Sequence, residues 1–475
     1  MAKWSEVKTL KDQIEDTIFE INGVNYIDIE TEFLPNDELG EAVLLVGTED
    51  TSKIPAITRA VKPLVGDFEF RVIEFKIMFT DSATPNETLT NTVKDLAQYR
   101  PLIGGCAIGM GANGDHSNKW MGTLGVFIPS TFWPFGFVGL TNQHVVGNFE
   151  DIYQPPIPRG MQPPIPKPIM TSSPNGDINS NIDANFCMFN EYAGAITREV
   201  LYQGVVRGVK PASLAMPVSK TGFMSGKTNG KITSTTVSLN YSGEMHGKPF
   251  TAIMKNQIQI KSSDTNPFQI KGDSGAVLVS SFGGDSVNLS VCLTGLMYAV
   301  DGNGNGYACH INKVLDQFDL SLPTYVPFYE FIGNGDHFYT TNYYMADGTG
   351  GRAGYNFTEI VCNVWATAAD AENLIPLYRW FCPINGDHLY TINSNEKPDH
   401  YNYEGIACYI MQVGSQQPSN TKKALVNLYR WYNPSTCHHM ISTTAQPKAG
   451  FQSEGIIGMV LSETIHVNDS FLQKL

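Results

Sequence analysis

The chain has 475 residues, of which 42% are apolar, 11% are aromatic and 16% are charged, and its formal net charge is −14. This length predicts about three domains rather than one. The high apolar and low charged content excludes a disordered chain. The acidic balance, without any cluster of Lys and Arg, excludes a function that depends on neutralising nucleic-acid phosphates.

No run of about 18 apolar residues occurs, so no membrane-spanning helix is predicted. The residues from Met1 to Glu6 lead into a charged segment without the apolar core of a secretory signal, and we therefore expect a cytoplasmic protein. The eight cysteines are spread along the chain and form no Cys-x-x-Cys pair, which indicates neither a zinc site nor a disulfide framework. We expect no metal and no cofactor.

Residues 1–90 have the pattern of a small α+β accessory module. Between residues 3 and 21, apolar side chains recur at spacings of three and four, which predicts a helix with one buried face. A second helical pattern from Leu89 to Ala97 is predicted to lead into the next domain. Strand-like runs lie at Val24–Phe33, Ala42–Val46 and Phe70–Phe79, with a proline-interrupted segment at Ile54–Pro63.

From Arg100 onward, short apolar runs alternate with glycine-containing turns, as in an all-β barrel or sandwich. The proline-rich stretch Gln154–Pro168 favours an extended surface loop, because proline cannot donate to a strand ladder. A ligand for an SH3-type domain is the alternative interpretation of that stretch.

Three side chains in this β-rich region have the types that nucleophilic catalysis requires. Ser274 lies between glycines in Gly272–Gly275, where a bend can present its hydroxyl beside backbone N–H groups. A serine needs a histidine base and an orienting carboxylate. His144 follows one apolar strand and Asp183 begins another. The order His144, Asp183, Ser274 predicts a catalytic triad.

These segments resemble the trypsin/chymotrypsin-like serine proteases, in particular their disulfide-free bacterial and intracellular members. The resemblance is carried by Leu140–Val145, Ile182–Ala184, Gly272–Gly275 and Gly295–Val300, and it extends over about residues 92 to 322. It implies a two-barrel protease domain at 91–322.

The resemblance also implies a role for each matching residue. His144 would be the general base, Asp183 its orienting partner and Ser274 the nucleophile, with Asp273 shaping the turn. Phe268 would lie at the base of the first substrate pocket, so a strict preference for Arg or Lys is not expected. The remaining implied residues are the oxyanion donors Gly272 and Ser274 and the substrate-pairing strand Tyr298, Ala299 and Val300.

Two further motifs have alternative interpretations. Leu102–Gly105 resembles the cleaved N-terminus that activates some of these proteases, but Pro101 and the disulfide-free character favour a site formed without cleavage. Asp301–Gly306 matches the first half of a calcium loop, but Asn312 stands where a bidentate Glu is needed, which favours a hairpin turn.

A threefold repeat occupies residues 323–475. Its copies begin at Phe328, Leu377 and Leu428, 49 and 51 residues apart. Three β-rich copies favour a closed β-trefoil. The signatures Gly-Asp-His-Phe-Tyr-Thr and Tyr-Arg-Trp resemble a β-trefoil-like repeat family appended to hydrolases and lectin-like proteins, which implies carbohydrate or glycoprotein binding. The candidate binding residues are Asp336, His337, Tyr339, Asp387, His388 and Tyr390, and a purely structural role for them is the alternative.

Together these features predict a mainly β protein with a trypsin-like protease domain, a C-terminal trefoil and a small N-terminal module. The expected function is a serine endopeptidase that acts on polypeptides and is targeted by its lectin-like domain. The alternative is a catalytically inactive protease-fold scaffold that binds carbohydrate.

Overall fold

The computed structural model divides the chain into two compact units. The first unit comprises Met1–Ile196, Val209–Ser280 and Leu293–Ser321, and the second comprises Thr197–Gly208, Ser281–Cys292 and Leu322–Leu475. The chain is mainly β, as its sequence predicts. The boundaries 1–90, 91–322 and 323–475 stay a prediction. The residues that the structure describes are 2–33, 39–79, 95–112, 115–130, 136–157, 166–179, 181–190, 192–194, 196–245, 248–282, 288–345, 349, 351–418, 421, 423–446 and 448–463.

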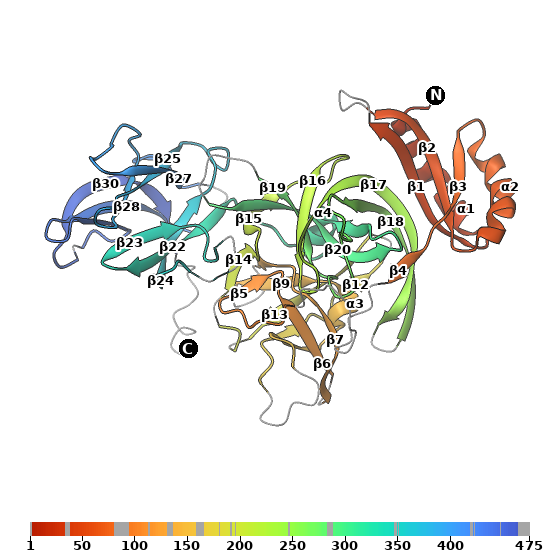
Figure 1. Cartoon of the computed structure of the whole chain (residues 1–475), viewed down its shortest axis with the longest axis horizontal. Helices are drawn as coiled ribbons and strands as arrows, with labels where there is room; N and C mark the ends of the chain where they lie inside the picture. Colours follow the sequence, from red (N-terminus) through yellow and green to blue (C-terminus); the bar gives the residue numbers. More distant parts are fainter. Residues whose placement is uncertain are drawn as a thin grey trace. The chain divides into compact units, whose positions relative to one another are not determined.

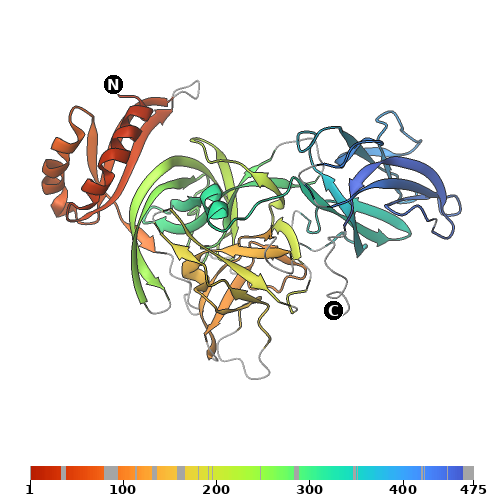
Figure 2. The same ribbon diagram turned by 180° about the vertical axis from the view of Figure 1, so that it is seen from behind.

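The N-terminal segment is a three-stranded sheet with two helices packed on one face (Figures 1 and 2). Helix α1 (Trp4–Phe19) has the predicted apolar face. Strands β1 (Val24–Phe33) and β2 (Leu39–Thr48) are antiparallel. Strand β3 (Phe70–Glu74) is parallel to β2, which requires a crossover, and helix α2 (Ile54–Val65) provides it.

Helix α2 occupies the segment that the sequence marks as interrupted by proline. Pro55 lies in the first turn, where a missing N–H is tolerated, and Pro63 lies near the C-terminal end. The apolar face containing Ile57 and Val61 joins the core beneath α1. Of the second predicted helix, residues 89–94 lie outside the described residues, and residues 95–99 have no regular secondary structure.

The next strands form one sheet in the order β7-β6-β10-β11-β13-β9-β8, with β12 added beside β13. A short helix, α3 (Gln143–Val146), follows β9 directly. Of the proline-rich stretch, residues 158–165 lie outside the described residues. The strands are β5 (Leu102–Gly104), which lies outside this sheet, and β6 (Ala107–Ala112), β7 (Asp115–Thr123), β8 (Val126–Pro129), β9 (Phe137–Thr141), β10 (Asp151–Tyr153), β11 (Met170–Ser172), β12 (Asp177–Ile178) and β13 (Asp183–Phe189).

The remaining strands of the first unit form a closed ring in the order β16-β17-β18-β21-β20-β19. Two N-terminal strands extend it: β1 pairs with β17, and β4 (Ile77–Phe79) pairs with β20. Helix α4 (Ile311–Gln317) follows β21 directly. The ring strands are β16 (Pro217–Gly222), β17 (Gly226–Met245), β18 (Lys248–Ser262), β19 (Val277–Ser281), β20 (Ser290–Asp301) and β21 (Gly306–His310).

The second unit contains three copies of one three-stranded antiparallel motif, so the threefold repeat is confirmed. In each copy the first strand pairs with both others, and its pairing with the third strand is irregular at two equivalent positions. The three third strands also pair with one another, which closes the arrangement. The β-trefoil assignment itself stays a prediction. The copies are β22 (Tyr325–Gly333), β23 (Asp336–Thr340) and β24 (Asn356–Trp365); β25 (Leu374–Phe381), β26 (His388–Thr391) and β27 (Asn402–Met411); and β28 (Leu425–Asn433), β29 (His438–Ser442) and β30 (Gln452–Leu461).

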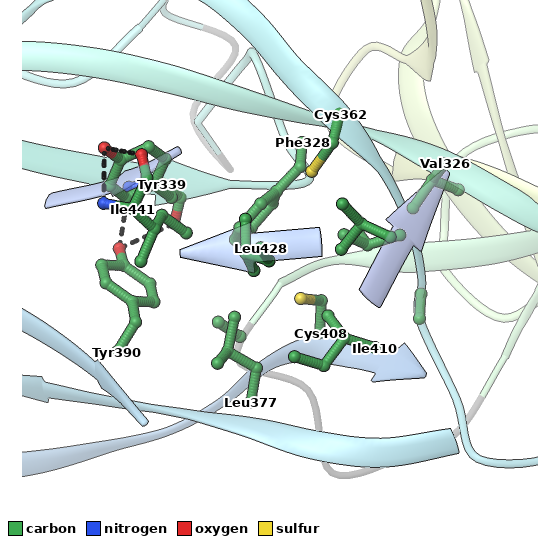
Figure 3. Close-up of a cluster of buried hydrophobic side chains, with 14 of the residues drawn as sticks. Val326, Phe328, Tyr339, Cys362, Leu377, Tyr390, Cys408, Ile410, Leu428 and Ile441 are labelled. Carbon is green, nitrogen blue, oxygen red and sulfur yellow. Dashed lines mark hydrogen bonds between the residues drawn. The ribbon is translucent and has the colours of Figure 1, made fainter. Parts of the chain in front are cut away.

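Equivalent residues from the three copies fill one common core (Figure 3). Phe328, Leu377 and Leu428 occupy the same repeat position and are fully buried. Val205 also belongs to this core, and it comes from the hairpin formed by β14 (Ile196–Val200) and β15 (Gly204–Val209). A single copy could not bury its apolar face alone, which is the usual property of such repeats.

The eight cysteines, all of which lie in the described part of the chain, form no disulfide bond, and seven of them are buried. Within the described residues, no helix is both long and apolar enough to cross a bilayer.

Candidate functional site

Two neighbouring antiparallel strands bring His144 and Asp183 to the same edge of the first sheet. Strand β9 ends at Thr141, which lies opposite Asn185 of β13. The chain therefore reaches His144 just after β9 ends and starts β13 at Asp183. Both side chains are buried, with 3% and 0% of their surfaces exposed.

The carboxylate of Asp183 contacts His144 through both of its oxygens. Oδ2 is in direct contact with the imidazole Nδ1, and Oδ1 accepts the backbone N–H of His144 at 3.2 Å. A carboxylate can only accept, so Nδ1 carries the proton and Nε2 is left as the acceptor. Nε2 is buried and has no hydrogen-bond partner among the described residues. This is the state that a general base requires.

Amide side chains hold the turn that carries the histidine. Asn142 Nδ2 donates to the backbone carbonyl of Asp183 at 2.6 Å. Asn185 Nδ2 donates to Gln143 Oε1 at 2.9 Å and to the Gly147 carbonyl at 2.6 Å, which fixes both ends of α3.

The turn that carries Ser274 contains two glycines, Gly272 and Gly275, with positive φ angles. Gly272 and Gly275 have φ angles of +97° and +91°, which side-chain-bearing residues rarely adopt. A Cβ atom at Gly275 would also lie 2.1 Å from the carbonyl oxygen of Thr123. The Ser274 hydroxyl donates to the backbone carbonyl of Tyr298 at 3.4 Å, and the residue is 1% exposed.

Strand β7 brings the serine turn next to the histidine turn. The N–H of Thr123 donates to the carbonyl of Ser274 at 2.8 Å. A Cβ atom at Gly122 would meet the Ser274 carbonyl oxygen at 3.1 Å and Cγ1 of Val145 at 2.5 Å. Ser274 and the residue after His144 therefore pack on the same glycine, so the three predicted triad segments converge.

Asp273 is structural, as the sequence resemblance implies. It is fully buried and accepts hydrogen bonds from Lys220 Nζ at 2.8 Å and Ser225 Oγ at 2.7 Å. Backbone N–H groups of Met224, Ser225 and Ile270 complete its shell. Because Lys220 supplies the cation, Asp273 does not need the amine of a cleaved N-terminus.

The predicted substrate pocket residue lies in the core of the closed ring. Phe268 is fully buried in an apolar cluster with Ile232, Ile258 and Met297. The predicted substrate-pairing residues Tyr298, Ala299 and Val300 are 0%, 0% and 4% exposed.

The strand edge expected to receive a substrate is occupied by the chain itself. Strand β21 pairs with one side of β20. On the other side, β4 pairs antiparallel, with Phe79 opposite Ala299 and Met78 opposite Val300. An N-terminal strand thus takes the position of an extended peptide.

The Asp301–Gly306 segment is a hairpin turn between β20 and β21. Asp301 Oδ1 accepts the N–H groups of Asn303 and Asn305 at 2.8 and 3.0 Å, and its Oδ2 accepts the hydroxyl of Tyr307 at 3.0 Å. Among the described residues, no group of three or more His, Cys, Asp or Glu side chains is placed to hold a metal ion.

In the second unit, the predicted sugar-binding aspartates join successive repeats. Asp336 of the first copy accepts the backbone N–H of His388 at 2.8 Å and contacts its Nδ1 at 2.6 Å. Asp387 of the second copy binds His439 of the third in the same way, at 2.6 Å for both bonds. The side chain of His439 was missed by the sequence analysis, although it occupies the equivalent repeat position.

The link from the third copy back to the first is different, because His438 stands where the other copies have Asp. His337 instead contacts Glu330 of its own copy at 2.8 Å, and Tyr339 donates to the same carboxylate at 2.7 Å. Tyr390 donates to the Tyr339 carbonyl at 2.9 Å. The six candidate sugar-binding residues are therefore buried and bonded to other protein groups.

Sequence reasoning missed Tyr241, whose side chain contacts those of both His144 and Asp183. Tyr241 of β17 is buried, and its hydroxyl lies 3.1 Å from Asp183 Oδ2 and 3.2 Å from His144 Nδ1. Nothing in the local sequence around Tyr241 distinguishes it from an ordinary core tyrosine.

Residues 327–465 match a family model described as Domain of unknown function (DUF5648). No curated protein matches the chain in sequence. Several solved structures resemble part of it. One, described as a glutamic acid specific serine protease that utilizes a novel histidine triad in substrate binding, is 14% identical, with a TM-score of 0.33 over 46% of this chain and 100% of its own. Thermobifida fusca protease A is 16% identical, with a TM-score of 0.33 over 46% of this chain and 97% of its own. Cellulomonas bogoriensis chymotrypsin is 18% identical, with a TM-score of 0.33 over 47% of this chain and 98% of its own.

Proposed function

We propose that the chain is a trypsin-like serine endopeptidase that cleaves polypeptides through an acyl-enzyme on Ser274. The observation that carries the proposal is the buried contact between Asp183 and His144 Nδ1 beside a glycine-framed serine turn. A histidine held in this tautomer has its Nε2 available to accept a proton.

In the proposed reaction, His144 Nε2 takes the proton of Ser274 Oγ while the oxygen attacks the scissile carbonyl. The negative oxygen that develops is stabilised by the N–H groups of Gly272 and Ser274. The imidazolium then gives its proton to the leaving amine as the peptide bond breaks. A water molecule, deprotonated by the same histidine, attacks the ester and releases the acid together with the free serine.

The strand Tyr298–Val300 would pair with the extended backbone of a substrate, which selects unstructured segments. Phe268, which is fully buried, offers no charge to an Arg or Lys side chain, so we expect no strict preference for either residue. Both assignments can be examined by profiling the cleavage sites in a denatured proteome.

Labelling by a fluorophosphonate probe tests the nucleophile. We expect wild-type protein to be labelled and to digest unfolded casein, and we expect Ser274→Ala to lose both properties. Ser281→Ala removes an exposed hydroxyl from the end of β19 and is the matched control, with labelling unchanged. Casein digestion at the wild-type rate by Ser274→Ala would exclude the proposal. Absence of labelling in folded wild-type protein would instead favour the inactive-scaffold alternative.

We also propose that the second unit binds a carbohydrate ligand through a surface aromatic residue. Tyr403 is 52% exposed, and its ring lies 4.9 Å from that of Trp380, which gives the surface an apolar platform suited to a sugar face. Glycan-array binding should be lost in Tyr403→Ala. Unchanged binding in that variant, or no binding by wild-type protein, would contradict this role.

A further inference from the structure

We propose that Tyr241 is a positioning residue that fixes the Asp183–His144 pair from the opposite sheet. The proposal deepens the proposed protease function and rests on it. Asp183 and His144 belong to the first sheet and its α3 turn, whereas Tyr241 lies on β17 of the closed ring. The tyrosine hydroxyl therefore forms a hydrogen bond across the two halves of the first unit.

The aromatic packing around Tyr241 fixes the direction of its hydroxyl. The ring packs edge-on against Tyr298 at 5.2 Å and Phe250 at 5.0 Å, and it lies edge-on to the imidazole of His144 at 6.3 Å. Tyr241 is 2% exposed. A side chain held in this way lacks the freedom to swing away from the carboxylate.

The chemistry of the two groups determines which is the donor in the Tyr241–Asp183 contact. Asp183 Oδ2 accepts, so the proton between Oη and Oδ2, which are 3.1 Å apart, belongs to the tyrosine. Burial raises the pKa of Tyr241 well above its ordinary value, and the neighbouring Asp183 raises it further, so the phenol keeps its proton. Oδ2 thus accepts from both Tyr241 and the imidazole, while Oδ1 accepts the His144 backbone N–H.

This arrangement restrains the carboxylate in two ways. The second donor on Oδ2 stops the carboxylate from rotating out of line with Nδ1. It also shares the negative charge of a side chain that is wholly removed from water, where each hydrogen bond to a charged group is worth more than a neutral one. The hydroxyl of Tyr241 contacts the Asp183 carboxylate and the imidazole Nδ1, so its contribution acts through the orientation of His144.

The test is Tyr241→Phe, which keeps the ring packing and removes only the hydroxyl. We expect kcat on a peptide substrate to fall about tenfold, corresponding to one lost charge-assisted hydrogen bond, while KM changes less than about twofold. Tyr26→Phe is the matched control. It removes an equally buried phenol that donates to Asp28 at 3.0 Å in the N-terminal sheet, and we expect kcat to stay unchanged.

A spectroscopic measurement separates this inference from the protease proposal. In the Ser274→Ala background, which needs no turnover, the low-field proton resonance of His144 Nδ1–H should move on adding Tyr241→Phe and stay in place on adding Tyr26→Phe. If the resonance moves but the wild-type protein cleaves no substrate, the positioning role of Tyr241 is supported and the protease function is excluded. An unmoved resonance together with a wild-type kcat in folded Tyr241→Phe would overturn the role of Tyr241.

Discussion

Two buried carboxylates of this protein, Asp273 and Glu199, are stabilised by different kinds of partners. Asp273 has an ammonium partner, Lys220, at 2.8 Å, and both side chains are wholly buried. Glu199 of the second unit has backbone partners, accepting the N–H groups of Tyr343 and Tyr344 at 2.6 and 3.0 Å. Two dipoles offset the loss of hydration less completely than a full opposite charge does. Burial therefore raises the pKa of Glu199 to about 8, although the two N–H bonds oppose the shift.

This raised pKa predicts that the second unit loses stability as the pH rises. Below about pH 4.5 the carboxyl is protonated in both the folded and the unfolded chain, so its contribution is fully present. Between about pH 4.5 and about pH 8, Glu199 ionises in the unfolded chain but keeps its proton in the folded chain. The free energy of unfolding therefore falls by at most about 1.4 kcal/mol per pH unit. In Glu199→Gln, the unfolding temperature of this unit, measured by calorimetry, should depend less on pH between pH 5 and 8 than it does in the wild-type protein.

The control for Glu199 is Glu359→Gln, which removes an exposed carboxyl from the same unit. It should leave the pH dependence as in wild type. Equal slopes for wild type and Glu199→Gln would show that Glu199 ionises alike in both states.

At the scale of single elements, β4 and β20 have the most consequence for function. Strand β20 needs a free edge if a substrate is to pair with Tyr298–Val300, and β4 fills that edge. An intramolecular strand has a high effective concentration, so a peptide added from solution competes at a disadvantage. The N-terminal segment is therefore expected to reduce the activity of the intact chain.

Displacing β4 should raise protease activity. Met78→Pro removes a backbone N–H and restricts φ within a three-residue strand, which should weaken its pairing with Val300. We expect kcat/KM on a peptide substrate to rise about tenfold. A synthetic peptide with the sequence of residues 75–79 should inhibit the variant competitively, and a scrambled peptide should not. Unchanged or lower activity in folded Met78→Pro would contradict a competing role for β4.

The sequence predicted those elements whose signal is local. The spacing of Val7, Ile14 and Ile18 is enough to identify α1, and the repeated signatures identify the three β-rich copies of the second unit. Helix α2 was missed because its two prolines looked like an interruption, although both lie near helix ends. Pairings between distant segments leave no local pattern, so the β4–β20 contact was not predictable.

The candidate site follows the same division. The sequence predicted Ser274, His144 and Asp183 as candidates because each lies at a strand end beside recognisable turn residues. It missed Tyr241 and the role of Lys220, since a side chain that enters from another strand has no spacing relation to the site. It also could not distinguish a binding role from a structural one for Asp336 and its equivalents, because a repeated residue is expected in either case.

At the scale of the whole molecule, the two compact units do not correspond to two consecutive stretches of chain. The chain passes from one unit to the other after Ile196, Gly208, Ser280, Cys292 and Ser321. Segments 197–208 and 281–292 therefore belong to the unit built on the C-terminal repeats. Val205 enters its core, Arg198 donates to the Tyr325 carbonyl at 2.6 Å, and Asn288 donates to the Ala407 carbonyl at 2.7 Å.

Residues 323–475 expressed alone should consequently be less stable than the same unit in the full chain. The isolated segment lacks the buried side chain of Val205 and therefore exposes apolar surface that the β14–β15 hairpin covers in the full chain. It also lacks the Glu199 carboxylate, which accepts hydrogen bonds from two backbone N–H groups of the repeats. Calorimetry should place its unfolding below the corresponding transition of the full chain. Within the full chain, Val205→Ala should lower the free energy of unfolding of this unit by about 2 kcal/mol, because the substitution leaves a cavity in the core. Val209→Ala alters the same strand at a residue that is 37% exposed and should have little effect. An isolated segment that unfolds at the full-chain temperature would show that the repeats are complete by themselves.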